Sequence, residues 1–425
     1  MTYPSRFMKS VFIALFITIF GLSGFRDYLT PALYWIVGCL PLLALGILEL
    51  RLRGLGGLMA AITDNALTKW MGVFWILFIA GIVVAGTVND IPFWMDTSKY
   101  LALALVFLAL LAIGIEQKQV VFGLKVWAAI AVCAVGGLYW FEVSNLLVIT
   151  PGRIAWILAY PGVLWKAGLF LLVWLLWRLL MGPLSVGRMS WLFIAAVIMG
   201  FDGSRSGILI AAGAFLFFLL LALVRYKSKM PSVLSRAAIV GLLVILAMGT
   251  VNPSPWNPMY QLHQLMPVAS TIDSGSAPVV RELAEDSVRL KMLKVALSGS
   301  IANFPFGGGF GTTGVPVERV DGLMVVHNTY LQLLSDIGLL GFIGYLGLFL
   351  VPVVAVYRRM SRTEDGWKVL DTYALPLGIL MCYSVSGMLH PVSSELSEWA
   401  IVLLAFCLLV RDRRPPESRR SLSGG

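Results

Sequence analysis

Three ionisable side chains in this sequence have the type and place that chemistry requires. Arg205 stands in GFDGSRSG, Arg289 lies in a later helical pattern, and His327 comes directly before a long apolar run. The rigid, planar fork of an arginine suits the oxygens of a phosphate group. An imidazole titrates near neutral pH and can therefore exchange a proton there. The sequence thus offers two cations for an anionic ligand and one group for proton transfer.

Each of these residues also has a simpler interpretation. Asp202 stands three residues before Arg205 and could neutralise it. Glu285 stands four residues before Arg289, and such an exposed pair contributes only a few tenths of a kcal/mol. A single histidine at the boundary of an apolar segment is often an interfacial residue. Residue type alone leaves these alternatives open.

A polar stripe follows His327 along the next segment. If a helix begins at Asn328, then Asn328, Gln332, Ser335 and Asp336 share one face of it. Within a bilayer such a face must contact a protein cavity or water. We therefore expect Asn328, Gln332 and Asp336 to line a cavity beneath His327.

A glycine-rich run, GGGFGTTG, occupies residues 307–314. Its spacing matches GxGxxG, but no strand pattern precedes it and a Val-Pro pair follows where a helix should begin. A phosphate-binding P-loop would need a Lys-Ser/Thr pair after the last glycine, where this sequence has the Val-Pro pair. Nucleotide binding is therefore rejected. A flexible hinge and a nest of backbone amides for a phosphate stay open.

The composition shows what kind of molecule must position these groups. Of 425 residues, 59% are apolar and only 13% are charged. A water-soluble or disordered chain would carry far more charge. The sequence therefore predicts an all-α polytopic membrane protein. Its four cysteines lie in apolar stretches without CxxC spacing, and its three histidines are far apart, so we expect no metal and no other cofactor.

About twelve apolar segments are long enough to cross a bilayer, alone or within a bundle. Most of the 32 Lys and Arg residues then fall in loops on one side, which places both termini in the cytoplasm. The first segment lacks a cleavage site, so we expect it to be retained. The expected spans are roughly 10–25, 31–48, 70–88, 100–115, 124–141, 162–181, 190–203, 205–224, 237–251, 328–357, 371–389 and 396–410.

One long polar segment, residues 252–327, is expected on the outer side. It opens with the turn-rich stretch VNPSPWNPMY. A helical pattern runs from about Val279 to Leu297, with Leu283, Leu290, Leu293 and Leu297 on one stripe. That pattern predicts a helix that lies on the bundle or in the membrane interface and ends at Gly299.

The order of these motifs resembles a known family. The run PFGGGFG, followed by HNTYLQLLSDIGLLGF and preceded by SRSG, resembles the Wzy_C region of the O-antigen ligase (WaaL-like) superfamily. The resemblance covers about residues 190–350. It divides the chain into N-terminal spans (1–189), this region, C-terminal spans (351–410) and a cytoplasmic tail (411–425).

The resemblance implies a metal-independent, inverting glycosyltransferase of the GT-C type in the bacterial inner membrane. Such an enzyme moves a polysaccharide from undecaprenyl diphosphate to lipid A–core on the periplasmic face. By this resemblance Arg205 and Arg289 would bind the donor diphosphate, and His327 would serve the acceptor. His390, Glu395 and Glu398 fall where family members often carry a polar outer patch.

Other functions are compatible with the same block. The O-antigen polymerase and the protein O-oligosaccharyltransferase share it, although the R-x10-G pattern of polymerases is missed by one residue at Arg289 and Gly299. Protein-glycosylating members tend to have larger C-terminal portions. A transporter is the alternative from another class, but no inverted repeat is visible and the charges gather at the outer face. The ligase is the favoured prediction, and no role follows for Arg153, Lys166, Arg281 or Arg319.

Overall fold

The structure is a computed structural model that describes most of the chain. It covers residues 5–251 and 283–410, apart from short gaps at 55, 57, 60–61, 63–64, 151–152, 160–161, 312–313, 318–319, 364 and 391–395. The expected turn-rich stretch after residue 251, the C-terminal tail, Arg281, Arg319 and Glu395 therefore lie outside the described residues.

The chain is an all-α polytopic membrane protein, as its composition predicted. In the described part, nine helices are long and apolar enough to cross a membrane, and α1, α9 and α16 are shorter apolar helices. Each expected span overlaps one of the long or apolar helices, with bounds that mostly differ by several residues. The helices are α1 (Arg6–Gly21), α3 (Pro31–Arg53), α5 (Ala66–Val88), α6 (Trp94–Ile113), α7 (Gln117–Trp140), α8 (Leu164–Met181), α9 (Val186–Asp202), α10 (Arg205–Arg225), α11 (Met230–Val251), α14 (Thr329–Arg362), α15 (Gly366–Ser386) and α16 (Leu396–Val410).

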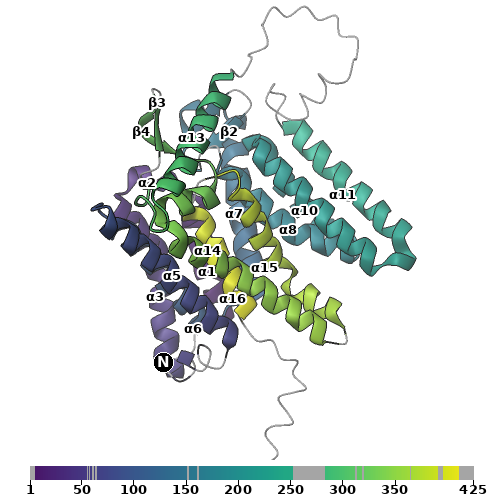
Figure 1. Cartoon of the computed structure of the whole chain (residues 1–425). Helices are drawn as coiled ribbons and strands as arrows, with labels where there is room; N and C mark the ends of the chain where they lie inside the picture. The colour runs from purple at the N-terminus through teal and green to yellow at the C-terminus, as the bar shows by residue number, and fades with distance from the viewer. Residues whose placement is uncertain are drawn as a thin grey trace, which may run out of the picture.

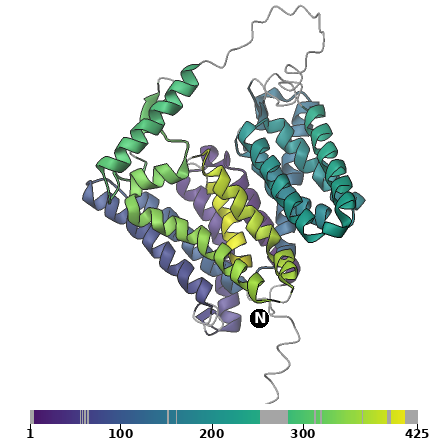
Figure 2. The same ribbon diagram turned by 45° about the vertical axis from the view of Figure 1, so that its right-hand side comes forward.

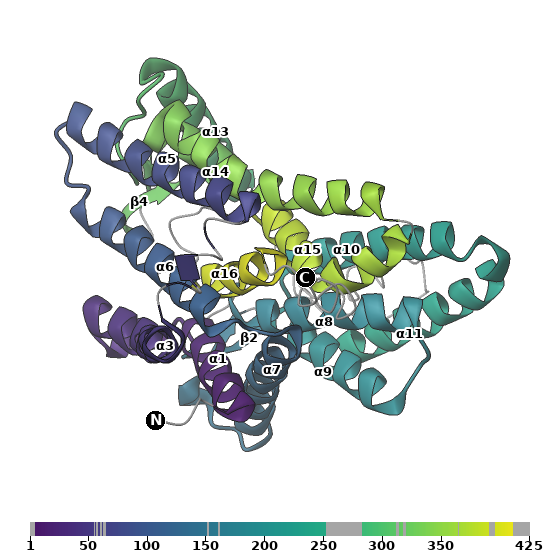
Figure 3. The same ribbon diagram turned by 90° about the horizontal axis from the view of Figure 1, so that it is seen from below.

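The helices form two groups with a central pair between them (Figures 1 and 2). Helices α8 to α11 pack on one another on one side. On the other side α14 runs along α5, and α3 packs against α6, as the view from below also shows (Figure 3). Helices α15 and α16 pack together between the two groups. Helices α1 and α7 join the groups as well, because α7 packs against α8 and α9, and α1 packs against α7 and α3.

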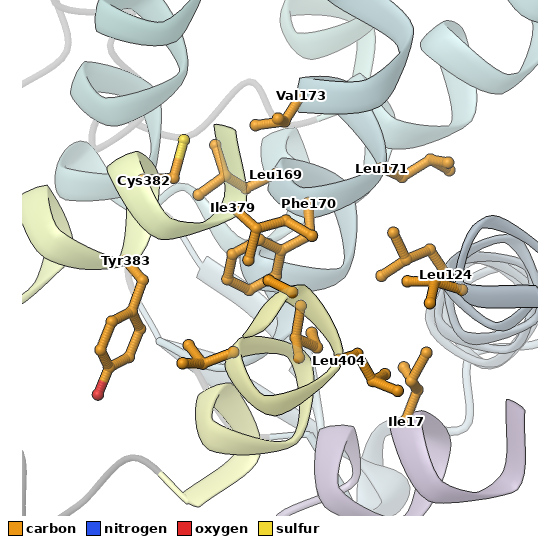
Figure 4. Packing of buried hydrophobic residues seen from close by; sticks show 14 of the residues in the cluster. Ile17, Leu124, Leu169, Phe170, Leu171, Val173, Ile379, Cys382, Tyr383 and Leu404 are labelled. Atoms are coloured by element: carbon orange, nitrogen blue, oxygen red, sulfur yellow. The ribbon is translucent and has the colours of Figure 1, made fainter. Parts of the chain in front are cut away.

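Helix α16 lies at the centre of the core. Every residue from 398 to 410 is buried, so this short helix has no face left for lipid. Figure 4 shows Leu404 of α16 among Phe170 of α8, Ile379 of α15 and residues of α1 and α7. A helix that is apolar on all sides is the kind that a core can bury completely.

Two small β-hairpins stand at one end of the bundle, which the sequence did not predict. Strands β1 (Leu147–Thr150) and β2 (Arg153–Trp156) join α7 to α8, and β3 (Gly314–Val317) and β4 (Val320–Val325) lead into α14. We call this end the site end, because α8, α10, α14 and α16 begin there. The N-terminus lies at the opposite end (Figure 1).

Helix α13 (Leu283–Ala302) differs in two ways from the expected amphipathic helix. It continues through Gly299, since Asn303 N donates a hydrogen bond to Gly299 O at 3.0 Å. A glycine inside a helix costs only about 1 kcal/mol, which helical bonding and packing can offset. The predicted end at Gly299 was therefore wrong.

The packed face of α13 is also not the leucine stripe. Met292 and Ala296 are buried against Val326, whereas Leu290, Leu293 and Leu297 are exposed. The helix was predicted to lie on the bundle or in the membrane interface. Its exposed leucine stripe is compatible with the membrane interface. Nothing in the leucine spacing alone identifies Met292 and Ala296 as the contact.

Candidate functional site

Helix α14 is broken at Gly338. This residue has φ 64° and ψ −167°, so the expected continuous helix over 328–357 is two helical segments. At the break, Leu339 N donates to Pro305 O at 2.8 Å. The backbone group that the helix leaves unpaired is thus satisfied by another segment, as a break within a bilayer requires.

That segment is the glycine loop, residues 305–311. Gly308 N donates to Ser335 O and Gly309 N to Asp336 O, both at 2.8 Å. Gly311 N donates to Asp336 Oδ2, also at 2.8 Å. These three amides bind oxygens of α14, whereas the sequence suggested a flexible hinge or a phosphate nest. Two of the oxygens are main-chain carbonyls, and the third belongs to the carboxylate of Asp336.

Glycine is required on both sides of this contact. A Cβ atom at Gly338 would lie 2.2 Å from Pro305 O, and one at Gly307 would lie 2.4 Å from Gly338 N. Gly307 also has a positive φ of 79°. Only glycine combines this backbone conformation with such close approach.

The predicted polar stripe exists and is buried. Gln332, Ser335 and Asp336 share one face of α14 with no exposed surface. Gln332 Nε2 donates to Asp336 Oδ2 at 3.3 Å, and Ser335 Oγ to Asp336 Oδ1 at 3.2 Å. At Asp336 the stripe faces the glycine loop, so part of the expected cavity is occupied by the chain.

His327 lies half-buried at the start of α14. Asn328 caps the helix, since its Oδ1 accepts from Leu331 N at 2.9 Å. Asn328 Nδ2 donates to Met388 O at 3.3 Å, and Thr329 Oγ1 donates to His390 O at 2.8 Å. The segment that carries His327 is therefore held against the residues that follow α15.

Arg205 is the exposed first residue of α10. Asp202, at the end of α9, is fully buried, and its Oδ2 accepts from Trp165 N at 2.9 Å and Gly162 N at 3.1 Å. A carboxylate that accepts hydrogen bonds from these backbone amides stabilises the start of α8. Asp202 therefore stabilises the start of α8, in addition to any charge that it neutralises on Arg205.

Trp165 connects the start of α10, which carries Arg205, to the start of α14, which follows His327. Its ring packs so tightly on Gly207 that a Cβ there would lie 2.7 Å away. The same ring lies 6.2 Å from the ring of His390, centroid to centroid. Since His390 O accepts from Thr329, α10 and α14 are connected through one aromatic residue of α8. Trp165 was not among the predicted site residues, because nothing in the sequence distinguishes it from the other tryptophans.

Beside Trp165 lies a buried ion pair. Lys166 Nζ is 2.8 Å from Glu398 Oε1, and both side chains are almost fully buried. The sequence assigned no role to Lys166 and left Glu398 in a general polar patch. A charged side chain in the first turn of a largely apolar helix was the signal that could have singled both out.

The third predicted residue, Arg289, belongs to α13. It lies one turn before Met292, which packs against Val326, and Val326 directly precedes His327. The structure therefore places the helix that carries Arg289 beside the start of α14. Within the described residues, no three His, Cys, Asp or Glu side chains gather as metal ligands would.

An apolar groove of about 360 Å³ opens next to the glycine loop. Its wall comes from α5, the loop and both sides of the break in α14, and all its side chains are apolar. Three of them, Leu339, Leu340 and Ile343, are 37 to 44% exposed. The lining residues are Val84, Pro305, Phe306, Ile337, Leu339, Leu340 and Ile343.

Fold and site together define a polytopic membrane protein with a broken helix, a docked glycine loop and cationic residues at one end of its bundle. No protein-family model matches the chain. The chain is similar to the teichuronic acid biosynthesis protein TuaE of Bacillus subtilis (strain 168), with 26% identity over 143 residues. The match covers 32% of the chain and 29% of that relative, so the chain spans less than a third of the relative's length.

Proposed function

We propose that the protein is a membrane glycosyltransferase of polysaccharide biosynthesis, and specifically an O-antigen ligase. One observation carries the proposal. The two halves of the family-like block, PFGGGFG and HNTYLQLLSDIG, are bound to each other by hydrogen bonds from loop amides to Ser335 and Asp336, about two helical turns after His327. Residues that resemble a catalytic region thus form one structural unit. The similarity to a teichuronic acid biosynthesis protein supports the broader assignment.

The donor in this proposal is a polysaccharide on undecaprenyl diphosphate. Arg205 and Arg289 bind its diphosphate and stabilise the negative charge that grows there as the sugar leaves. Two fixed guanidinium groups can supply this without a metal ion. The apolar groove beside the break offers a place for the polyprenyl tail, while the sugars stay in water.

The transfer is inverting and has one displacement step. A hydroxyl of lipid A–core attacks the anomeric carbon, and His327 takes the hydroxyl proton as general base. The new C–O bond forms as the bond to the diphosphate oxygen breaks, and undecaprenyl diphosphate leaves. Asn328, Gln332 and Asp336 hold the start of α14 and the glycine loop around the acceptor.

This chemistry places the site end on the periplasmic face of the bacterial inner membrane. Both termini are then cytoplasmic, which agrees with the excess of basic residues on that side. It also agrees with the N-terminus at the end of the bundle opposite the hairpins (Figure 1).

A polysaccharide polymerase is the second candidate. It uses the same donor and the same step, but its acceptor is another sugar chain. The similarity to a teichuronic acid biosynthesis protein favours it over a protein-glycosylating enzyme or a transporter.

Gel analysis of lipopolysaccharide from a deletion strain separates these functions. A ligase predicts that long chains disappear from lipid A and persist on the lipid carrier. Loss of chain length identifies a polymerase instead. An unchanged banding pattern would contradict both and return the transporter as the explanation.

A further inference from the structure

A buried ion pair joins α8 to α16 at the site end. Lys166 Nζ and Glu398 Oε1 are 2.8 Å apart, with side-chain exposures of 0% and 4%. Desolvation offsets most of the attraction in such a pair, and apolar replacements are often neutral or stabilising. Stability alone therefore does not explain why two charges lie in this core.

The start of α8 is fixed by its contacts with Asp202 and Gly207, whereas the start of α16 has few polar contacts that fix its position. Glu398 is the one charged residue of α16, and it lies in the first turn, at the site end. The hydrogen bonds that other helices share with α16 lie toward its opposite end, where Asn65 Nδ2 donates to Val410 O at 2.6 Å and Cys407 Sγ donates to Phe107 O at 3.8 Å. The residues between Glu398 and that end are buried and mostly apolar. An apolar helix can rotate or slide against apolar neighbours at small cost, and a single buried polar contact selects one arrangement. The pair thus sets the depth and rotation of α16 relative to α8.

On the α8 side, the position of the first turn affects the residues on either side of Arg205. Trp165, next to Lys166, donates from its backbone N to Asp202 and packs its ring on Gly207. Asp202 and Gly207 stand three residues before and two residues after Arg205. A shift of the first turn of α8 must therefore move the start of α10.

On the α16 side, the position of the helix affects the residues that follow His327. Trp399, next to Glu398, contacts Tyr345 of α14 and Tyr383 of α15, with ring centroids 6.3 Å and 6.2 Å apart. The residues after α15 in turn accept hydrogen bonds from Asn328 and Thr329. A change in the position of α16 would therefore displace the start of α14 beside His327.

We infer that Lys166 and Glu398 are a positioning pair, which holds the start of α10 and the start of α14 at the spacing that glycosyl transfer requires. Both side chains are buried and act through Trp165 and Trp399. The consequence for turnover rests on the proposed function, but the consequence for geometry does not. A displacement of about 1 Å in a reacting group can cost on the order of 100-fold in rate.

Two double variants test the inference. Lys166→Met/Glu398→Leu removes both charges at similar volume, and Lys166→Glu/Glu398→Lys exchanges them. The matched control is Lys9→Met/Glu49→Leu, which neutralises a second strongly buried pair, between α1 and α3. Lys9 also donates to Ile113 O, at the end of the bundle opposite the site. All three proteins are compared at equal folded concentration, with melting temperature as the check.

The first measurement is geometric and needs no substrate. Spin labels at Leu209 of α10 and Met388 after α15, which are 68% and 57% exposed, report the spacing of the two ends. The exposed Cys133 is replaced by serine, whereas the other three cysteines are buried. We expect a narrow distance distribution in the parent, the exchanged variant and the control, and a broadened or shifted one in the neutral variant.

The second measurement is single-turnover transfer from a polyprenyl-diphosphate donor. We expect the neutral variant to lose about 10- to 100-fold in rate, and the exchanged variant to recover most of it. A narrow distribution together with parental turnover in the neutral variant would overturn the inference. So would lost turnover at unchanged spacing, or full turnover at altered spacing. If the parent itself transfers nothing, the proposed function fails, while the spin-label result still decides the positioning role.

Discussion

At the scale of single residues, the proposed site consists of one histidine and two arginines from different helices, and their joint role is a prediction. The residue types were visible in the sequence, because ionisable groups are rare in this chain and therefore conspicuous. Their supporting contacts were not visible. Asp202 proved to hold the start of α8, and Asp336 proved to hold the glycine loop. Both contacts join segments distant in sequence, which no local pattern encodes.

Replacement of His327 tests its role as general base. We expect His327→Ala to insert and to bind donor, but to transfer at least about 100-fold more slowly, since general bases contribute roughly 10²- to 10⁴-fold. The base must be neutral, so the wild-type rate should fall as pH drops through the titration of imidazole, near 6.5 for the free side chain. Single-turnover rates between about pH 5 and 8 decide this. A flat profile, or a fully active His327→Gln protein, would leave His327 outside the chemistry.

Conservative replacement of the arginines tests the diphosphate contact. Arg205→Lys and Arg289→Lys keep the charge but lose the planar fork, so we expect turnover to fall on the order of 10²- to 10³-fold. Arg358→Lys, an exposed change at the far end of α14, is the control. Purified variants are compared by initial rates at saturating acceptor. Near-parental rates in either site variant would remove that arginine from the donor site.

At the scale of elements, the sequence predicts the spans well and their irregularities poorly. About 20 consecutive apolar residues suffice to identify a span, so every expected helix was found. The break in α14 was not predicted, because SDIGLLGF reads locally as one continuing helix. Its cause is the glycine loop, which lies about thirty residues earlier and replaces helical hydrogen bonds at Gly338. The hairpin β3–β4 between these segments was missed for a similar reason, since such short strands give little pattern.

The break itself can be tested with one methyl group. Gly338→Ala places a Cβ 2.2 Å from Pro305 O at a φ of 64°, so the glycine loop must move. We expect a loss of roughly 1–3 kcal/mol in stability and a loss of transfer activity. Gly213→Ala in α10 is the matched control, because nothing lies within 4 Å of its added Cβ. Melting temperature and transfer rate are measured for both. Equal behaviour of the two variants would show that the docked loop is not needed.

At the scale of the whole molecule, the residues of the proposed site come from both helix groups at one end of the bundle. Arg205 comes from one group, Arg289 and His327 come from the other, and α15 and α16 stand between them. If the proposed function holds, this layout makes the spacing of the two groups important for activity, and the ion pair between α8 of one group and α16 of the central pair is placed to control it. The layout also leaves the groove between α5 and α14 open at the side of the bundle, beside the glycine loop.

The groove provides a test of how a lipid-linked donor would enter. If the polyprenyl tail lies there, a larger side chain should displace it, so Leu340→Trp should raise the donor KM and leave the rate at saturation nearly unchanged. Leu350→Trp is the control, since Leu350 is 57% exposed on the same helix and does not line the groove. The comparison is made with a full-length polyprenyl donor and with a short-chain analogue that cannot reach the groove. The substitution should affect only the long donor, because each buried CH₂ group contributes about 0.8 kcal/mol to binding. Equal KM increases for both donors would point to a distorted site, and an unchanged KM for the long donor would place the tail elsewhere on the protein.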